Sequence, residues 1–280
     1  MPAIFKTTNH RSGGFTIVEI LVVLTVLGIL IGLVLNTLGD FYYANTTSLG
    51  KTVQDTDTRY SLRAIESELS NTAGWSTSLP VASAPLGMNN SGTAWSYCGN
   101  DCATDGKRVL IAYVMATDKP KSDNTRLPTF TPSTSGSSCD PAQAGIIKNA
   151  LIYFIAQDPS GNSNLYRRTI VNPFNLAICS GSSIDASQKT TCSPWQVSTY
   201  PAVCKGPDAL LLPNVTSLSI NYYGFSSNST PVSTQYTSNP NAATDVAAAK
   251  TVELKVTTSA NYQGVANTST SAIRVSRLYP

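Results

Sequence analysis

The stretch Gly13-Gly14-Phe15-Thr16-Ile17-Val18-Glu19 opens an apolar run that continues to Leu35. Between Phe15 and Leu35 there are 21 residues and a single ionisable side chain, that of Glu19. At the helical rise of 1.5 Å per residue, this run is about 31 Å long, which matches the hydrocarbon core of a bilayer. We therefore expect residues 15–35 to form a membrane-spanning helix, preceded by a polar segment at 1–14.

Three details separate this run from an ordinary secretion signal. The small-residue cleavage signal normally follows the apolar region, whereas Gly13 and Gly14 precede it. A lone carboxylate such as that of Glu19 costs about 3 kcal/mol inside a membrane, so it is expected to have a partner. The alternative is that Glu19 reaches the lipid headgroups from its place near the helix start. Gly28 and Gly32 form a G-x-x-x-G pair, which favours close helix packing in lipid, although glycine is also simply tolerated there.

At these residues the sequence resembles the type IV pilin and pseudopilin superfamily, the proteins with class III signal peptides. The family pattern is a short basic leader, a Gly, a Phe or Met, then Thr-Leu-hydrophobic-Glu and an apolar helix. Here the pattern reads Gly14, then Phe15-Thr16-Ile17-Val18-Glu19. The strand predicted at 164–170 carries Leu165-Tyr166-Arg167 after a turn, and this further resembles the larger minor pilins and pseudopilins of the W and J type.

The resemblance implies that a prepilin peptidase removes the leader 1–14 by cutting between Gly14 and Phe15, and that the new terminus is N-methylated. In an assembled filament, Glu19 would pair with the amino terminus of a neighbouring subunit or with its own. Gly28 and Gly32 would lie in the packed filament core. The implied partners are other pilin subunits, the peptidase and methyltransferase, an assembly platform protein and an extrusion ATPase complex.

The remainder of the chain is predicted to be one α+β domain over 36–280, with the pilin fold. The helix is expected to continue over 36–73 and to pack one apolar stripe on an antiparallel sheet. The expected stripe consists of Leu49, Val53, Thr56 and Tyr60, followed by Leu62, Ile65 and Leu69. Strands are predicted at 108–115, 150–155, 164–170, 216–223 and 251–257, with a last edge strand at 271–278. The segment 158–162 has the composition of a turn, so it is expected to join a hairpin.

All six cysteines lie beyond the apolar run, and an even number in an exported domain favours disulfides. They are Cys98, Cys102, Cys139, Cys179, Cys192 and Cys204. A Cys98–Cys102 bridge is the first expectation, with two of Cys179, Cys192 and Cys204 forming a second. A zinc site is the alternative, but the chain has no C-x-x-C pair and its one histidine, His10, is in the leader.

The charge distribution predicts the orientation of the chain. Lys6 and Arg11 precede the apolar run and no comparable cationic cluster directly follows it, so the positive-inside rule places the N-terminus in the cytoplasm. We expect a single-pass protein of the inner, cytoplasmic membrane that later joins a cell-surface filament. The sequence shows no cluster of basic residues of the kind that indicates nucleic-acid binding.

The sequence favours a structural role over an enzymatic one, without a cofactor. It contains no G-x-S-x-G, Walker A or H-E-x-x-H motif, and removal of the leader would also remove His10. Asp101 and Asp105 are a weak candidate for calcium. The leading hypothesis is a filament subunit of a type IV pilus or type II secretion system, and a minor pilin that primes assembly or lies near the tip. The alternatives are an adhesin or binding module mounted on a pilin helix and a plain membrane-anchored exoprotein.

Overall fold

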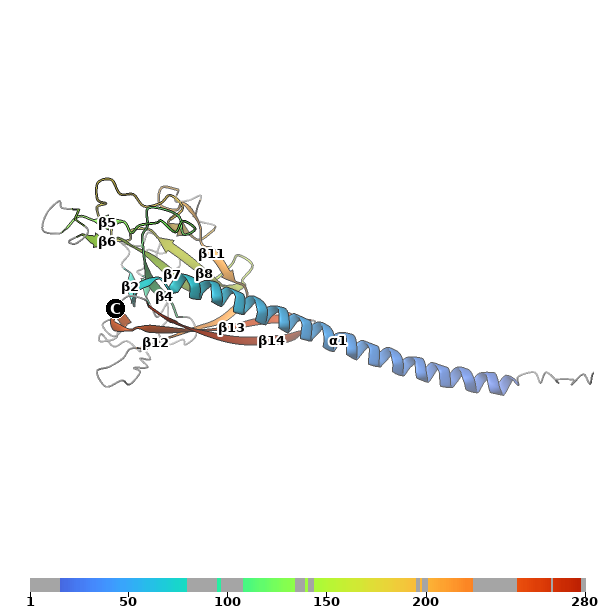
Figure 1. Cartoon of the computed structure of the whole chain (residues 1–280). Coiled ribbons are helices and arrows are strands. Elements are labelled where there is room, and N and C mark those ends of the chain that lie inside the picture. The colour runs from blue at the N-terminus through green and yellow to red at the C-terminus, as the bar shows by residue number, and fades with distance from the viewer. Residues whose placement is uncertain are drawn as a thin grey trace, which may run out of the picture. The chain divides into compact units, whose positions relative to one another are not determined.

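The computed structural model describes residues 16–79, 95–96, 108–133, 139–140, 144–194, 197, 201–223, 246–262 and 264–277. The chain forms two compact units, Met1–Gly50 and Lys51–Pro280. The helix α1 (Ile17–Leu69) begins in the first unit and ends in the second, and the strands β1 to β14 follow it (Figure 1). The predicted α+β class, with a long N-terminal helix and antiparallel strands, is therefore confirmed, and the fold is pilin-like.

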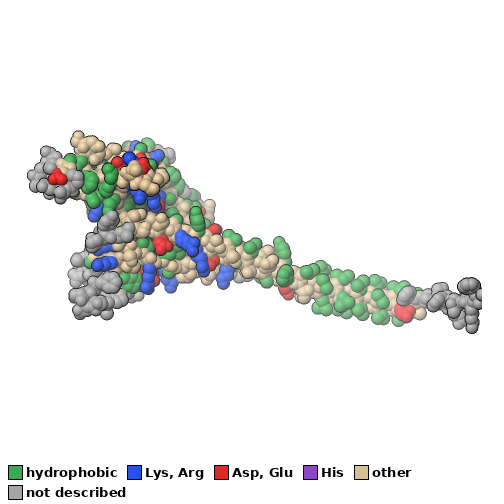
Figure 2. Space-filling view, in the orientation of Figure 1, with side chains coloured by type: hydrophobic (Ala, Val, Ile, Leu, Met, Phe, Trp, Pro, Cys, Tyr) green, Lys and Arg blue, Asp and Glu red, His purple; other side chains and the backbone are tan. Residues whose placement is uncertain are grey.

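In the first unit, every Ile, Leu and Val side chain of α1 between Ile17 and Leu38 is exposed. Figure 2 shows these hydrophobic side chains along the surface of the helix. Hydroxyl groups within this stretch are satisfied by the helix itself, since Thr25 donates to the carbonyl of Val22 and Thr37 to that of Val34. A helix that satisfies its own hydroxyl groups and exposes mostly apolar side chains is suited to lipid or to other helices.

The second unit contains two main antiparallel sheets. The five-stranded sheet has the order β1-β4-β7-β8-β11, and the three-stranded sheet the order β12-β13-β14. The strands of the first are β1 (Thr72–Ser76), β4 (Leu110–Met115), β7 (Lys148–Gln157), β8 (Ser163–Ile170) and β11 (Ala209–Leu212). Those of the second are β12 (Val215–Tyr223), β13 (Thr251–Tyr262) and β14 (Val265–Ser276).

The described part of the unit also contains three short strand pairs. They are β2 (Ser78–Leu79) with β3 (Trp95–Ser96), β5 (Phe130–Thr131) with β6 (Gly145–Ile146), and β9 (Thr191–Cys192) with β10 (Gly206–Pro207). The first two pairs are antiparallel and the last is parallel.

The predicted hairpin is the centre of the larger sheet. β7 and β8 pair in continuous register from Ala150–Ile170 to Gln157–Ser163. The turn forms because the carboxylate of Asp158 accepts the backbone N–H groups of Ser160 and Asn162, each at 2.9 Å. Gly161 takes the left-handed conformation at φ 85° that this turn requires.

The larger sheet is buried on both faces, as its alternation predicts. Tyr153 and Leu110 point into the core shared with α1 and the three-stranded sheet. Their neighbours Ile152 and Ile111 point the opposite way, into a second core with Leu79 and Trp95. The first core holds the helix and the two main sheets together, and α1 contributes Leu62, Ile65 and Leu69 to it.

Two details of the strand prediction differ in the structure. The strand predicted at 216–223 is β12, which pairs with β13. β11 was not predicted: it pairs with β8 and is separated from β12 at Asn214, which has a positive φ of 56°. The predicted last strand is at the sheet edge as expected, but it begins at Val265 and pairs with β13 over its whole length.

The predicted stripe on α1 is correct in its second half and wrong in its first. Leu62, Ile65 and Leu69 are buried, whereas Leu49, Val53 and Tyr60 are exposed by 65%, 50% and 77%.

The face of α1 that turns inward beside this stripe is polar. The amide of Gln54 donates to Thr258 of β13 at 2.7 Å, and the hydroxyl of Thr58 donates to the carbonyl of Gln54. The hydroxyl of Ser269 in β14 donates to Asp55 at 3.3 Å. Long-range hydrogen bonds to the β13–β14 hairpin therefore select the buried face here, and not apolar spacing.

Candidate assembly site on the N-terminal helix

Glu19 lies one turn inside α1, and its carboxylate is aimed back at the helix start. Its Oε2 accepts both the backbone N–H and the hydroxyl of Thr16, each at 3.0 Å. The hydroxyl of Thr16 in turn accepts the backbone N–H of Glu19 at 3.3 Å. This reciprocal arrangement is a capping box, which satisfies two donors that the first turn would otherwise leave free.

The capping role of Thr16 was missed by the sequence analysis, although a signal for it exists. Thr16-Ile17-Val18-Glu19 is a T-x-x-E pattern directly before an apolar run, which is the sequence signature of a capping box. The structure thus gives Glu19 a partner within its own chain. It also places the carboxylate where the positive end of the helix dipole favours a negative charge.

Gly28 and Gly32 lie one turn apart on α1. A Cβ atom built at either position would meet no heavy atom within 4 Å. The described chain therefore leaves this small-residue face open. Gly14 and Phe15, the predicted cleavage and methylation residues, lie outside the described residues.

The last turns of α1 are fastened to the larger sheet by a polar cluster in the second unit. The Glu68 carboxylate accepts the hydroxyl of Tyr153 at 2.9 Å and forms an ion pair with Arg167. Tyr153 is completely buried. Burial raises the pKa of Tyr153 well above its usual range, and the charge of Glu68 adds to this effect. The neutral phenol consequently acts as a donor that ties the helix to β7.

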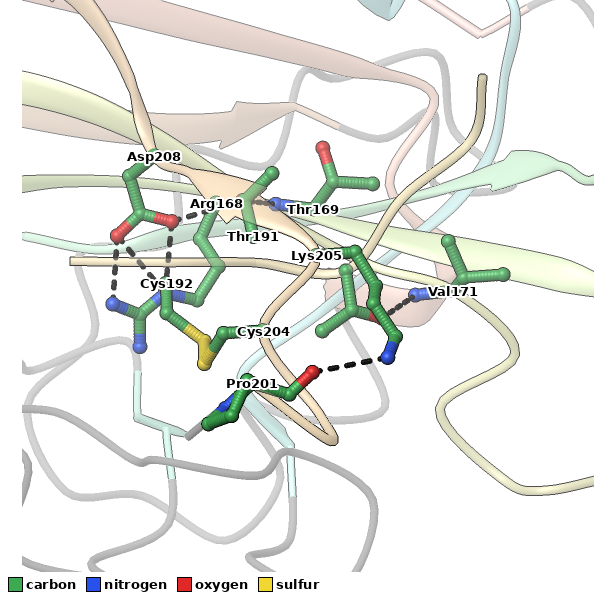
Figure 3. The surroundings of a disulfide bond; sticks show 10 residues. Arg168, Thr169, Val171, Thr191, Cys192, Pro201, Cys204, Lys205 and Asp208 are labelled. Atoms are coloured by element: carbon green, nitrogen blue, oxygen red, sulfur yellow. Dashed lines mark hydrogen bonds and ion pairs between the residues drawn. A yellow bond between two sulfur atoms is a disulfide. The ribbon is translucent and has the colours of Figure 1, made fainter. Parts of the chain in front are cut away.

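A second polar cluster lies where β8 meets the loop that carries β9 and β10 (Figure 3). The guanidinium of Arg168 binds both carboxylate oxygens of Asp208, with an Nη2–Oδ2 distance of 2.7 Å. The two side chains are only 3% and 1% exposed. Thr191 also donates to Asp208, at 2.9 Å, and the ring of Trp95 lies 5.2 Å from the guanidinium carbon. A charge pair so fully removed from water is stable only because its hydrogen bonds are largely satisfied.

The prediction of disulfides in the loops is confirmed. Cys192 pairs with Cys204 and closes the loop next to Asp208 (Figure 3). Cys139 pairs with Cys179, and so ties down the excursion that follows β4. The predicted Cys98–Cys102 bridge lies outside the described residues.

Within the described ranges, no group of three or more His, Cys, Asp or Glu side chains is arranged to hold a metal ion. The weak calcium candidates Asp101 and Asp105 are beyond those ranges. Over the same part of the chain, α1 is the one helix long and apolar enough to cross a membrane.

Comparison with known proteins gives one match. Residues 9–35 match the family model described as the prokaryotic N-terminal methylation motif. No curated protein and no solved structure matches the chain. The motif implies processing by a prepilin peptidase and assembly with other pilin subunits, and the proteins that carry it are structural subunits. The motif at residues 9–35 opens a long apolar helix. These two features together are those of the class III signal of the type IV pilins.

Proposed function

We propose that this protein is a structural subunit of a type IV pilus-like or type II secretion filament, and specifically a minor pilin that primes assembly or lies near the tip. One observation carries the proposal. The methylation motif opens a helix whose Ile, Leu and Val side chains, from Ile17 to Leu38, are each about half or more exposed in the described chain. Such a surface must be covered by lipid before assembly and by other subunits after it.

The proposed maturation follows from the same residues. Residues 1–14 form the leader, 15–35 the membrane and filament-core helix, and 36–280 the external domain with the second half of the helix at 36–73. Prepilin peptidase cuts between Gly14 and Phe15, and Phe15 is then N-methylated. The protein waits in the inner membrane with its N-terminus in the cytoplasm, until a platform protein and an extrusion ATPase add it to the filament.

Glu19 has two separable properties in this proposal. Its oxygen completes the capping box with Thr16, and its charge is available to the amino terminus that cleavage creates at Phe15. Pairing of the two charges lowers the cost of a carboxylate in a low-dielectric filament core. Gly28 and Gly32 would allow close helix packing in the same core.

The test is to compare Glu19→Val with Glu19→Gln in the native host. Both variants should still be exported and cleaved, because cleavage depends on Gly14 and Phe15. Glutamine keeps an acceptor for Thr16 but has no charge. We therefore expect both variants to be lost from sheared filaments, as measured by immunoblotting against the membrane pool.

Asp40→Val provides the matched control, because it removes the next acidic side chain of α1 and should be incorporated normally. Normal incorporation of Glu19→Val would refute a role for the carboxylate. Incorporation of Glu19→Gln alone would show that capping, and not charge, is what assembly needs.

A further inference from the structure

The external end of the membrane helix carries three consecutive aromatic side chains. Phe41, Tyr42 and Tyr43 are exposed by 72%, 67% and 42%. Since successive helical residues are separated by about 100°, the three rings point in different directions and surround more than half of the helix. Neither tyrosine hydroxyl has a hydrogen-bonding partner among the described residues.

The polarity of α1 differs on the two sides of these aromatic residues. Residues 20–39 contain no charged side chain, and at 1.5 Å per residue they span about 30 Å, the thickness of a bilayer core. Asp40 is the first charge after Glu19, and the aromatic residues follow it directly. Asn45, Thr46 and Thr47 then begin a polar stretch.

We propose that Phe41, Tyr42 and Tyr43 form an aromatic belt that binds the headgroup region of the outer leaflet of the membrane. Tyrosine rings, with an apolar body and a polar hydroxyl, favour the boundary between hydrocarbon and water; Phe41 adds an apolar ring beside them. The free tyrosine hydroxyls supply donors for the ester and phosphate oxygens of phospholipids. The partner is therefore a glycerophospholipid interface and not a second protein.

The belt fixes the position of the helix in the bilayer. With Phe41–Tyr43 at one boundary, the charge-free run 20–39 fills the hydrocarbon and Glu19 reaches the opposite boundary. Before assembly, the segment in lipid is then displaced toward the external domain relative to the 15–35 of the proposed function. The carboxylate is then close to headgroups before assembly and needs an ionic partner only when the helix leaves the lipid. This inference rests on the membrane-held state in the proposed function, but it does not depend on polymerisation.

The test measures depth in vesicles. The full chain with Tyr42→Trp is reconstituted in phosphatidylcholine–phosphatidylglycerol vesicles whose lipids carry bromine at shallow, middle or deep acyl positions. The fluorescence that the substitution adds to that of the parent chain should be quenched most by the shallow bromines.

Two matched variants calibrate this result. Leu30→Trp, in the middle of the apolar run, should be quenched most by the deep bromines. Tyr60→Trp replaces a tyrosine that is even more exposed, at 77% against 67% for Tyr42, and lies much further along the same helix; it should not be quenched at any depth. A Tyr42→Trp signal that behaves like either control would overturn the belt. A shallow signal in a chain that fails to enter filaments would leave the belt standing and refute the proposed function.

Discussion

Arg168 and Asp208 show how the fold treats individual charges. Both side chains are almost completely removed from water, and the loop that carries Asp208 is closed by the Cys192–Cys204 disulfide. The backbone N–H of Asp208 also donates to the carbonyl of Cys192 at 2.6 Å. The disulfide thus holds the carboxylate in place against β8, and the ion pair is part of the loop attachment.

Asp208→Asn should destabilise the folded protein by about 3 kcal/mol, because it leaves the buried guanidinium of Arg168 without a compensating charge. Urea unfolding of the full chain in detergent, followed by circular dichroism, measures this loss. The double replacement Arg168→Met with Asp208→Leu removes both charges and should cost much less. Equal losses in the single and double variants would contradict the view that the unpaired charge dominates.

The raised pKa of Tyr153 predicts how the free energy of unfolding changes at alkaline pH. The pKa of Tyr153 in the folded state is raised above the unfolded value of about 10. The stabilisation that the neutral phenol gives to the folded state is therefore complete below pH 10 and is lost as pH rises above that value. Tyr153→Phe should therefore lower stability at neutral pH, through loss of the bond to Glu68, but flatten the decline above pH 10. Some decline should remain, because burial also raises the pKa of Tyr113.

The control for this measurement is Tyr60→Phe, which changes an exposed side chain and should leave the alkaline decline as it is. If the free energy of unfolding of Tyr153→Phe declined above pH 10 as steeply as that of the parent chain, ionisation of Tyr153 would not be the cause of the decline.

At the scale of the element, α1 has two different functional halves within one helix. In the first unit its apolar side chains face outward. In the second unit its inward face changes from polar at Gln54 and Thr58 to apolar at Leu62, Ile65 and Leu69. The firm attachment of the helix to the sheet is therefore expected near its C-terminal end, where the Glu68 cluster also lies.

Leu62→Ala and Leu49→Ala remove the same atoms from the two faces of α1. Leu62 is 2% exposed and belongs to the main core, so its truncation should cost about 2–5 kcal/mol of unfolding free energy. Leu49 is 65% exposed, and its truncation should change stability by less than about 0.5 kcal/mol. Similar losses at both positions, measured by urea unfolding, would contradict the assignment of the buried face.

At the scale of the whole molecule, the sequence predicts local features better than long-range partners. The apolar run, the α1 continuation and the β7–β8 hairpin follow from periodicity and turn chemistry, which act over a few residues. The division of the strands between two sheets depends on the backbone conformation of Asn214 and on contacts between residues distant in sequence. One such contact is the hydrogen bond from the backbone N–H of Asn214 to Oδ1 of Asn164, at 3.1 Å. No single-sequence pattern reports such pairings.

The residues of the candidate site and of α1 likewise separate into features that local sequence predicts and features that depend on a distant partner. The position of Glu19 in the apolar run predicts that its carboxylate needs a partner but does not name that partner. The T-x-x-E pattern at 16–19 is the local signal for the bond to Thr16. The incorrect half of the α1 stripe has a physical cause: Leu49, Val53 and Tyr60 have suitable spacing, but the hairpin offers hydrogen bonds to Gln54 and Asp55 on another face. Periodicity identifies a face that can be buried, and the partner decides which face is.

We propose that cleavage at Gly14–Phe15 converts the membrane-held chain into a filament subunit. Mass spectrometry of the chain recovered from sheared filaments of the native host tests it most directly. We expect an N-terminal peptide that begins at Phe15 and carries one methyl group on its amino nitrogen. A chain that retains Met1–Gly14 and is found only in the membrane fraction would contradict it.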